Sequence, residues 1–80
     1  MYFVYILRSK ADGGYYIGFT ENVAKRLEYH NSGKQRSTRR RIPFELIHTE
    51  VYPSKKEALT REKKIKSYKG GLAFKKLIGI

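Results

Sequence analysis

The sequence contains no cysteine, so neither disulfide bonds nor a zinc site built from thiolates can supplement its core. It also lacks any hydrophobic run long enough to cross a membrane. Its N-terminal apolar run, residues 2–7, is too short for the hydrophobic region of a signal peptide, and positive charges follow that run instead of preceding it. These absences predict a soluble, cytoplasmic protein that is stabilised by apolar packing and secondary structure.

Acidic residues are scarce in the chain. The chain has seven Asp and Glu residues and 18 Lys and Arg residues, which gives a formal net charge of +11. Such an excess predicts a polyanionic partner, although charge alone does not separate a nuclease from an RNA binder of ribosomal type or from a merely soluble basic protein. A hydrophobic fraction of 40% with 14% aromatic residues argues for a packed fold over disorder. Eighty residues suffice for a single domain, residues 1–80, with one modest core.

The first part of the chain has the pattern of a hairpin followed by a helix. Two runs of β-branched and aromatic residues, 2–8 and 15–20, flank a turn-forming segment of hairpin length. Thr20 or Asn22 can then cap a helix that ends near residues 31–33, where Asn, Ser and Gly follow one another.

The second part predicts a third strand and two further helices. Residues 44–52 alternate as a strand, with a proline at either side. Ser54 and Glu57 form a capping box that opens a helix to about residue 68, where a glycine pair follows. Residues 72–78 can form a last short helix that partly buries Leu72, Phe74, Leu77 and Ile78. The expected fold is α/β, a small three-stranded, mostly antiparallel sheet flanked by helices in the order β-β-α-β-α-α.

Residues 34–43 hold five basic side chains, separated by serine and threonine, with no apolar residue before Ile42. This predicts an exposed loop that contacts nucleic-acid phosphates together with lysines of the following helix. The candidate nucleic-acid-binding residues are Lys34, Arg36, Arg39, Arg40, Arg41, Lys63 and Lys66. Phosphate contacts carry little sequence information, so weakly sequence-specific or structure-guided binding is expected.

Glu62 is the acidic residue that says most about chemistry. On a helix with about 100° per residue it projects in one arc with Ala58, Leu59 and Ile65, so its carboxylate lies in the stripe that should face the core. A buried carboxylate must be compensated. An ion pair with an arginine at the edge of the core is one solution, and a divalent cation such as magnesium is the other. From the residues alone, both remain open.

Arg26 and His30 lie four residues apart on the first predicted helix and therefore share one flank of it. Arginine presents a planar fork of donors suited to phosphate, and histidine can exchange a proton near neutral pH. Tyr5 and Tyr16 can face this flank from paired strands, where a nearby cation or metal would lower the phenol pKa from its ordinary value of about 10. Taken singly, such residues more often form a solvated face or pack a sheet.

The order of these residues resembles that of the GIY-YIG nuclease superfamily. Residues 3–5 (Phe-Val-Tyr) and 16–18 (Tyr-Ile-Gly) are similar to its paired tripeptides, with Phe and Val in the places of the first Gly and Ile. The resemblance continues through Arg26, the pair His30 and Asn31, and Glu62 within residues 58–66. The resemblance covers almost the whole chain. It is strongest for the short stand-alone bacterial members that are related to the nuclease domain of the excision-repair endonuclease.

The resemblance implies a metal-dependent DNA endonuclease, with DNA repair as the associated process. The reaction would be phosphodiester hydrolysis that leaves a 5′-phosphate and a 3′-hydroxyl. Tyr5 would be the general base or would position it, Tyr16 would orient water or phosphate, and Arg26 would neutralise charge on the scissile phosphate. His30 would relay the proton. Glu62 would hold a single Mg²⁺ or Mn²⁺ ion.

One feature of the family is missing, and other functions compete with nuclease activity. Many members have an asparagine about a helix turn or more beyond the glutamate, whereas residues 68–76 contain none. The alternative function is a non-catalytic nucleic-acid-binding module on the same scaffold, including an RNA binder of ribosomal type. A basic amphipathic surface for membranes is disfavoured, because Glu62 interrupts the apolar stripe. A monomer is expected, with a dimer as the alternative.

Overall fold

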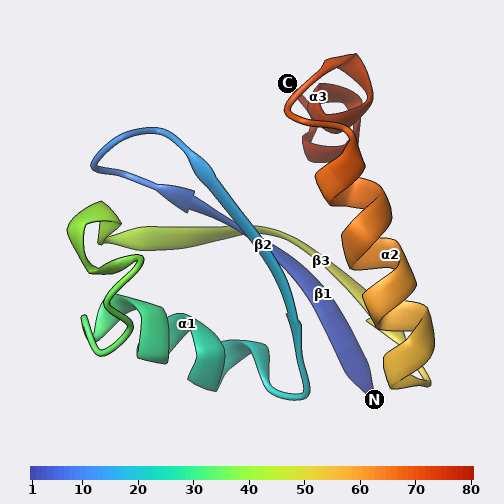
Figure 1. Cartoon of the computed structure of the whole chain (residues 1–80), viewed down its shortest axis with the longest axis horizontal. Helices are drawn as coiled ribbons and strands as arrows, with labels where there is room; N and C mark the ends of the chain where they lie inside the picture. Colours follow the sequence, from blue (N-terminus) through green and yellow to red (C-terminus); the bar gives the residue numbers. More distant parts are fainter.

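The computed structural model describes all of residues 1–80 (Figure 1). In chain order the elements are β1 (Tyr2–Ser9), β2 (Tyr15–Thr20), α1 (Val23–Asn31), the 3-10 turn η1 (Arg39–Arg41), β3 (Phe44–Tyr52), α2 (Lys55–Ser67) and α3 (Leu72–Ile78). The predicted order of strands and α-helices is confirmed, and the 3-10 turn is an addition to it. None of the helices combines the length and the apolar character that crossing a membrane requires.

The sheet has β1 at its centre, with β2 along one side and β3 along the other. Both pairings are antiparallel, so the sheet is wholly antiparallel where the sequence predicted mostly antiparallel. Side chains alternate between the faces of a strand, which places Val4 and Ile6 on one face of β1 and Tyr5 and Leu7 on the other. The two outer strands leave one free edge each.

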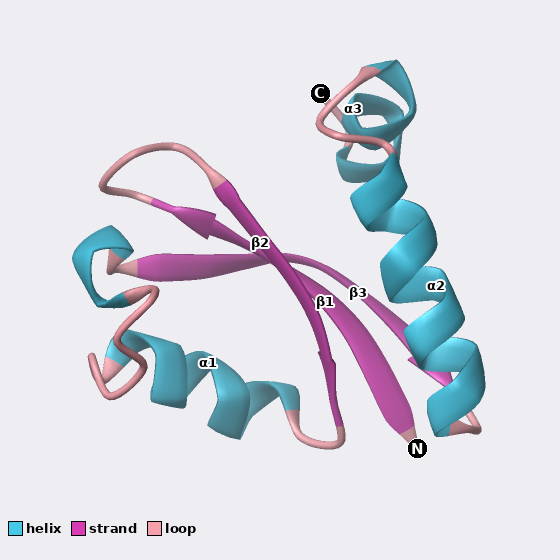
Figure 2. Cartoon of the chain, viewed as in Figure 1, coloured by secondary structure: helices cyan, strands magenta, loops and turns pink.

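Helices cover both faces of the sheet, with α1 on one side and α2 followed by α3 on the other (Figure 2). The core beneath α2 and α3 contains Val4, Ile6, Ala58, Ile65 and Phe74. The core on the α1 side contains Tyr5, Leu7 and Phe44, against which Val23 and Leu27 of α1 pack. The second core therefore holds α1 against the face of the sheet that carries Tyr5.

Polar side chains cap the first turns of α1 and α2. The Asn22 side chain accepts a hydrogen bond from the backbone N–H of Lys25 at 3.0 Å, so Asn22 and not Thr20 is the cap of α1. Ser54 accepts from the backbone N–H of Glu57 at 3.2 Å and donates its hydroxyl to the Glu57 carboxylate at 3.0 Å. The predicted cap of α2 is confirmed.

The predicted burial of Leu72 is wrong. Phe74 is buried in α3, and Leu77 and Ile78 pack against the same core, but Leu72 is 71% exposed. Successive helical residues are turned by about 100°, so Leu72 and Phe74 project to nearly opposite sides of a helix. A helix of seven residues that turns Phe74 inward therefore directs Leu72 to solvent.

The prediction of a uniformly exposed loop at residues 34–43 is also wrong in part. Thr38 is buried, and Arg41 is only partly exposed. The η1 turn brings the Arg41 side chain back to the β1–β2 turn, where its Nε donates to Asp12 at 3.1 Å and its Nη2 donates to the Tyr15 carbonyl at 3.2 Å. Arg41 braces the hairpin, and Arg39 and Arg40 are the exposed arginines of the turn.

A cluster of polar side chains ties β3 to α2. The Arg61 guanidinium donates twice to Glu50, at 2.7 and 3.1 Å, and the Tyr52 hydroxyl and His48 Nε2 lie 2.6 and 2.7 Å from the same carboxylate. Burial by itself would raise the pKa of Glu50, but these hydrogen bonds outweigh burial and hold the pKa at about 2. The cluster therefore stabilises the fold only while Glu50 is ionised.

Glu50→Gln is expected to lower the free energy of unfolding by about 2 kcal/mol at pH 7, because charge-assisted hydrogen bonds are lost. The depressed pKa of Glu50 means that the wild type loses this contribution as pH falls from about 4.5 toward 2, so the difference between the proteins should shrink over that interval. Urea melts at pH 7 and pH 3 measure both effects. Glu45→Gln, on the same strand in an exposed pair with Lys10 at 4.0 Å, is the control and should change stability by less than about 0.5 kcal/mol. Equal losses in the two variants would contradict the role of the cluster.

Candidate active site

The Tyr5 ring packs over β2 because its cross-strand neighbour there is a glycine. Tyr5 and Gly18 are cross-strand partners. A Cβ atom added to Gly18 would lie 2.6 Å from the Tyr5 hydroxyl oxygen and 2.8 Å from Cζ, well inside van der Waals contact. A glycine is therefore needed at the third position of the Tyr-Ile-Gly tripeptide, because any side chain there would occupy the space in which the phenol lies.

Gly18→Ala is expected to destabilise the protein by about 1–3 kcal/mol, the usual range for overpacking. Tyr5 is 3% exposed, so its ring cannot swing into solvent to relieve the contact. Gly14→Ala is the comparison, because its added Cβ would also approach within 2.8 Å of another atom, but that atom ends the Arg41 side chain, so the loss should not exceed that of the Arg41 hydrogen bonds. Thermal melts should show the larger loss for Gly18→Ala, and the reverse order would contradict this role of Gly18.

His30 of α1 lies at the centre of an aromatic cluster and is fully buried. Its ring centroid is 4.6 Å from that of Tyr16, 6.2 Å from Tyr5, 5.9 Å from Tyr29 and 5.8 Å from Phe44. The Tyr5 and Tyr16 rings stack at 6.3 Å, and the Tyr5 hydroxyl lies 3.3 Å from His30 Nε2. The structure thus brings Tyr5, Tyr16 and His30 together from two strands and a helix.

Both proton-exchanging groups of this cluster are neutral near pH 7. Burial, followed by the electrostatic effect of Tyr16, raises the pKa of Tyr5 well above its ordinary value, and the opposing effect of Arg26 is smaller. Burial and then the charge of Arg26 lower the pKa of His30. The nearby cation Arg26 does lower the Tyr5 pKa, as expected, but the effects of burial and Tyr16 outweigh it. Tyr5 is a phenol beside a neutral imidazole, which is an arrangement suited to passing a proton.

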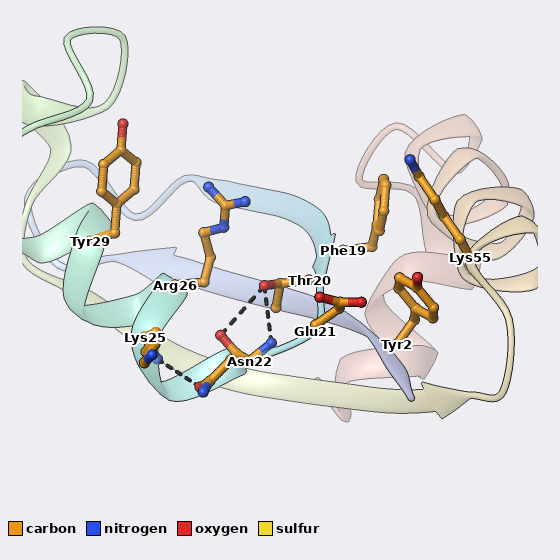
Figure 3. A pocket seen from close by; sticks show the side chains of 9 residues that line it. All are labelled: Tyr2, Phe19, Thr20, Glu21, Asn22, Lys25, Arg26, Tyr29 and Lys55. Carbon is orange, nitrogen blue, oxygen red and sulfur yellow. Dashed lines mark hydrogen bonds between the residues drawn. The ribbon is translucent and has the colours of Figure 1, made fainter.

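Arg26 lies on the exposed flank of α1 and lines a groove of about 670 Å³ (Figure 3). Lys25 and Lys55 bring two further cations to the groove, and the Arg26 guanidinium lies 5.7 Å from the centre of the Tyr29 ring. The other residues that line the groove are Tyr2, Phe19, Thr20, Glu21 and Asn22. Three cations against one carboxylate favour the phosphates of a nucleic-acid strand.

Glu62 lies where the helical pattern placed it, between Ala58 and Ile65 on the buried side of α2, and is 8% exposed. Its Oε1 accepts from Nζ of Lys66 at 3.0 Å, one helical turn along. The compensating ion pair therefore comes from a half-exposed lysine of the same helix, where the sequence suggested an arginine. Because α2 covers the face opposite α1, Glu62 approaches the site from the other side of the sheet, and its charge contributes to the raised pKa of Tyr5.

A divalent ion at Glu62 would have few protein ligands. The structure contains no group of three His, Asp or Glu side chains placed to hold a metal together. Magnesium usually keeps several waters and binds through one or two carboxylates plus substrate phosphate. A carboxylate oxygen whose only ion-pair partner is a half-exposed lysine fits such a hydrated, weakly held ion.

The remaining predicted residues are distributed over the surface, and others were missed. Lys34, Arg36, Arg39, Arg40 and Lys63 are exposed, as expected for phosphate ligands. Sequence reasoning missed Lys25 and Lys55 in the groove and buried Thr38 beside His30. Lys25 directly precedes Arg26 and could have been found by that position. Lys55 and Thr38 could not, because only the packed structure brings them to the site.

Comparison with known proteins places this architecture in a family. The GIY-YIG catalytic domain matches residues 1–73. The chain is 43% identical over 68 residues to a UPF0213 protein of Streptococcus pneumoniae serotype 4, covering 84% of this chain and 68% of the relative. It is 46% identical over 67 residues to a UPF0213 protein of Natronomonas pharaonis, covering 82% and 78%. In a pneumococcal relative from strain R6 the matched part spans 61% of that protein's length.

The fold has a similar solved counterpart. The chain matches the solution NMR structure of the UPF0213 protein BH0048 from Bacillus halodurans with a TM-score of 0.50 and 40% identity, covering 91% of this chain and 90% of the other. The chain belongs to the GIY-YIG family of catalytic domains, as the order of its residues indicated. Membership supports a nuclease-type function with nucleic acid as the substrate class.

Proposed function

We propose that this protein is a metal-dependent DNA endonuclease. The observation that carries the proposal is the buried contact between the Tyr5 hydroxyl and His30 Nε2, at 3.3 Å. Tyr29, whose ring lies 5.9 Å from that of His30, also lines the cationic groove with Arg26. A protein that only binds phosphates needs cations at its surface and gains nothing from a buried pair able to exchange a proton. Such a pair is what general base catalysis of water attack requires.

The residues of the site divide the reaction among them. Tyr5 takes a proton from the attacking water while its own proton passes to His30 Nε2, so the raised pKa of the phenol is bypassed by the relay. The water oxygen bonds to phosphorus as the bond to the 3′ oxygen breaks. The 3′ oxygen takes a proton from solvent and His30 returns its proton to solvent, which leaves a 5′-phosphate and a 3′-hydroxyl. Arg26 neutralises charge on the phosphate, and Tyr16, stacked on Tyr5, orients water or phosphate.

Glu62 is the residue proposed to hold Mg²⁺ or Mn²⁺. When bound, such an ion stabilises negative charge on the phosphate and the leaving oxygen. Glu62 offers a hard oxygen donor, and its partner Lys66 is exposed enough to release it. The same lysine can then move to a DNA phosphate, so the ion pair does not oppose metal binding strongly.

The substrate is proposed to be DNA held through its backbone by a monomer in the cytoplasm. The groove cations Lys25, Arg26 and Lys55 would follow one strand, and the exposed arginines of residues 34–43 would extend the contact. These ligands address phosphates, so binding should be weakly sequence-specific or guided by structure, as a role in DNA repair would require.

A non-catalytic nucleic-acid-binding module is the second candidate, and two observations favour it. Residues 68–76 lack the asparagine that many family members carry, and Glu62 would be the only carboxylate at the metal. Incubation of the purified protein with supercoiled plasmid in Mg²⁺, in Mn²⁺ and in EDTA decides between the two. The endonuclease nicks the plasmid with either metal and not in EDTA, whereas salt-sensitive binding without nicking in any condition identifies the module.

DNA binding should weaken steeply with salt, because each phosphate contact releases condensed counterions. Replacing Arg39 and Arg40 together with Gln should reduce the log-log slope by about 2 and change the free energy of unfolding by less than about 0.5 kcal/mol, since both are exposed. Fluorescence anisotropy across salt concentrations measures the slope. Arg41→Gln is the matched control, because the Arg41 side chain is hydrogen-bonded to the hairpin. This variant should lower the melting temperature but keep most of the salt dependence of DNA binding. A double variant with an unchanged slope would remove residues 39 and 40 from the interface.

A further inference from the structure

The second ring nitrogen of His30 contacts Thr38, a residue that has no role in the proposed reaction. His30 Nδ1 lies 3.4 Å from the hydroxyl oxygen of Thr38, and that hydroxyl lies 3.4 Å from the backbone carbonyl of Gln35, to which it donates. Thr38 is 3% exposed although it stands in the most basic stretch of the chain. No buried side-chain nitrogen or oxygen in the protein lacks a partner, so both ring nitrogens are satisfied by Tyr5 and Thr38.

The direction of this chain of hydrogen bonds follows from counting protons. A carbonyl can only accept, so the Thr38 hydroxyl donates to Gln35 and its oxygen is left to accept from His30 Nδ1–H. Nε2 then carries a lone pair and accepts from the Tyr5 hydroxyl. In the opposite arrangement, with the proton on Nε2, the Nδ1 lone pair would face the lone pairs of the Thr38 oxygen unless the hydroxyl turned away from the Gln35 carbonyl. Only the first arrangement keeps both the hydrogen bond from Thr38 to Gln35 and the one between His30 and Thr38.

We infer that Thr38 is a positioning residue, whose hydroxyl keeps the proton of His30 on Nδ1 and so presents the Nε2 lone pair to the Tyr5 hydroxyl. Its meaning for catalysis rests on the proposed nuclease reaction, because Nε2 can receive the phenol proton only in this tautomer. The tautomer itself does not depend on activity. Thr38 acts on the proposed reaction through His30.

The position of Thr38 also links the site to the DNA-binding surface. Thr38 immediately precedes Arg39 and Arg40, and the backbone N–H of Arg41 donates to the Thr38 carbonyl at 2.9 Å. The turn that exposes the two arginines is therefore the turn that holds the threonine against His30. The ionisable groups near His30 are Tyr5 from β1, Tyr16 from β2, and Tyr29 and Arg26 from α1, and none of them offers a second partner for Nδ1.

Long-range ¹H–¹⁵N NMR of the histidine rings at pH 7 tests the inference directly. The wild type and Thr38→Ser, which keeps the hydroxyl, should both carry the His30 proton on Nδ1. Thr38→Val, which keeps the shape and loses the acceptor, should shift it toward Nε2, the ordinary preference of a histidine ring. His48→Asn separates the two histidines of the chain. A wild-type proton on Nε2, or a Thr38→Val spectrum unchanged from the wild type in a folded protein, would overturn the inference.

A cleavage assay then separates this inference from the proposed function. With an active wild type, Thr38→Val should lower kcat by about 10–100-fold with KM nearly unchanged, and Thr38→Ser should restore kcat. Equal kcat values for all three proteins would remove Thr38 from the mechanism. If the wild type never cleaves DNA but the NMR result holds, the nuclease proposal fails while the tautomer assignment stands. Thermal melts of both variants confirm that the chain is folded in each comparison.

Discussion

Glu62→Gln is expected to lower Mg²⁺-dependent cleavage by about 10²–10³-fold, because stabilisation of transition-state charge by a bound metal contributes several kcal/mol. The amide keeps the shape of the side chain and loses the charge that would hold the ion. DNA binding should survive, since the phosphate ligands are untouched. The free energy of unfolding should change by no more than about 0.5 kcal/mol, the usual contribution of an i,i+4 pair such as Glu62 with Lys66.

Lys66→Gln is the matched control for this variant. It breaks the same ion pair but keeps the carboxylate, so kcat should be retained and any loss should be in DNA affinity. If Glu62 serves the fold alone, Glu62→Gln should destabilise the protein without a selective effect on turnover. Plasmid nicking at saturating DNA, together with thermal melts of the three proteins, gives the comparison. A Glu62→Gln variant that nicks at the wild-type rate would exclude metal binding by Glu62.

Tyr5→Phe should reduce the cleavage rate by about 10²–10⁴-fold, the range associated with a positioned proton-transfer group. The substitution keeps the ring over Gly18 and removes only the hydroxyl that meets His30 Nε2. Loss of that partner from a buried nitrogen should also reduce the free energy of unfolding by about 1–2 kcal/mol. Affinity for DNA should stay within twofold of wild type.

Tyr15→Phe provides the comparison within the same hairpin. Tyr15 lies on the opposite face of the sheet, where its ring meets Phe74 edge-on at 4.9 Å. Its hydroxyl has no part in the proposed relay, so cleavage should equal that of the wild type. Single-turnover rates for the two variants separate a catalytic phenol from a packing one, and a Tyr5→Phe rate equal to that of Tyr15→Phe would remove Tyr5 from the reaction.

The sequence predicts the elements of this fold well because short-range signals determine them. The bounds of β2 and β3 agree with the expected residues 15–20 and 44–52, since glycines and prolines punctuate those runs. Ser54 caps α2 as the spacing to Glu57 indicated. The helical period placed Glu62 on the buried side of α2. Each of these features depends on residues that lie within one or two turns of one another.

Features that depend on long-range contacts could not be read in the same way. Arg41 pairs with Asp12, 29 positions away, only because the η1 turn folds back onto the hairpin. Thr38 contacts His30 only in the folded protein, and nothing in the residues next to it in the sequence indicates that it is buried. The raised pKa of Tyr5 follows from how deeply the ring is enclosed, which residue spacing does not report. The sequence therefore identified candidate residues, and packing determined the state in which they are held.

A crystal structure with Mn²⁺ and a short oligonucleotide tests the central proposal most directly. The anomalous signal of manganese should appear beside the Glu62 carboxylate, with Lys66 displaced from Oε1. A DNA phosphate should lie against the Arg26 guanidinium, within reach of the Tyr5 hydroxyl. Oligonucleotide bound along the exposed arginines with no manganese at Glu62 and no phosphate at Arg26 would contradict the nuclease and identify a binding module on a nuclease scaffold.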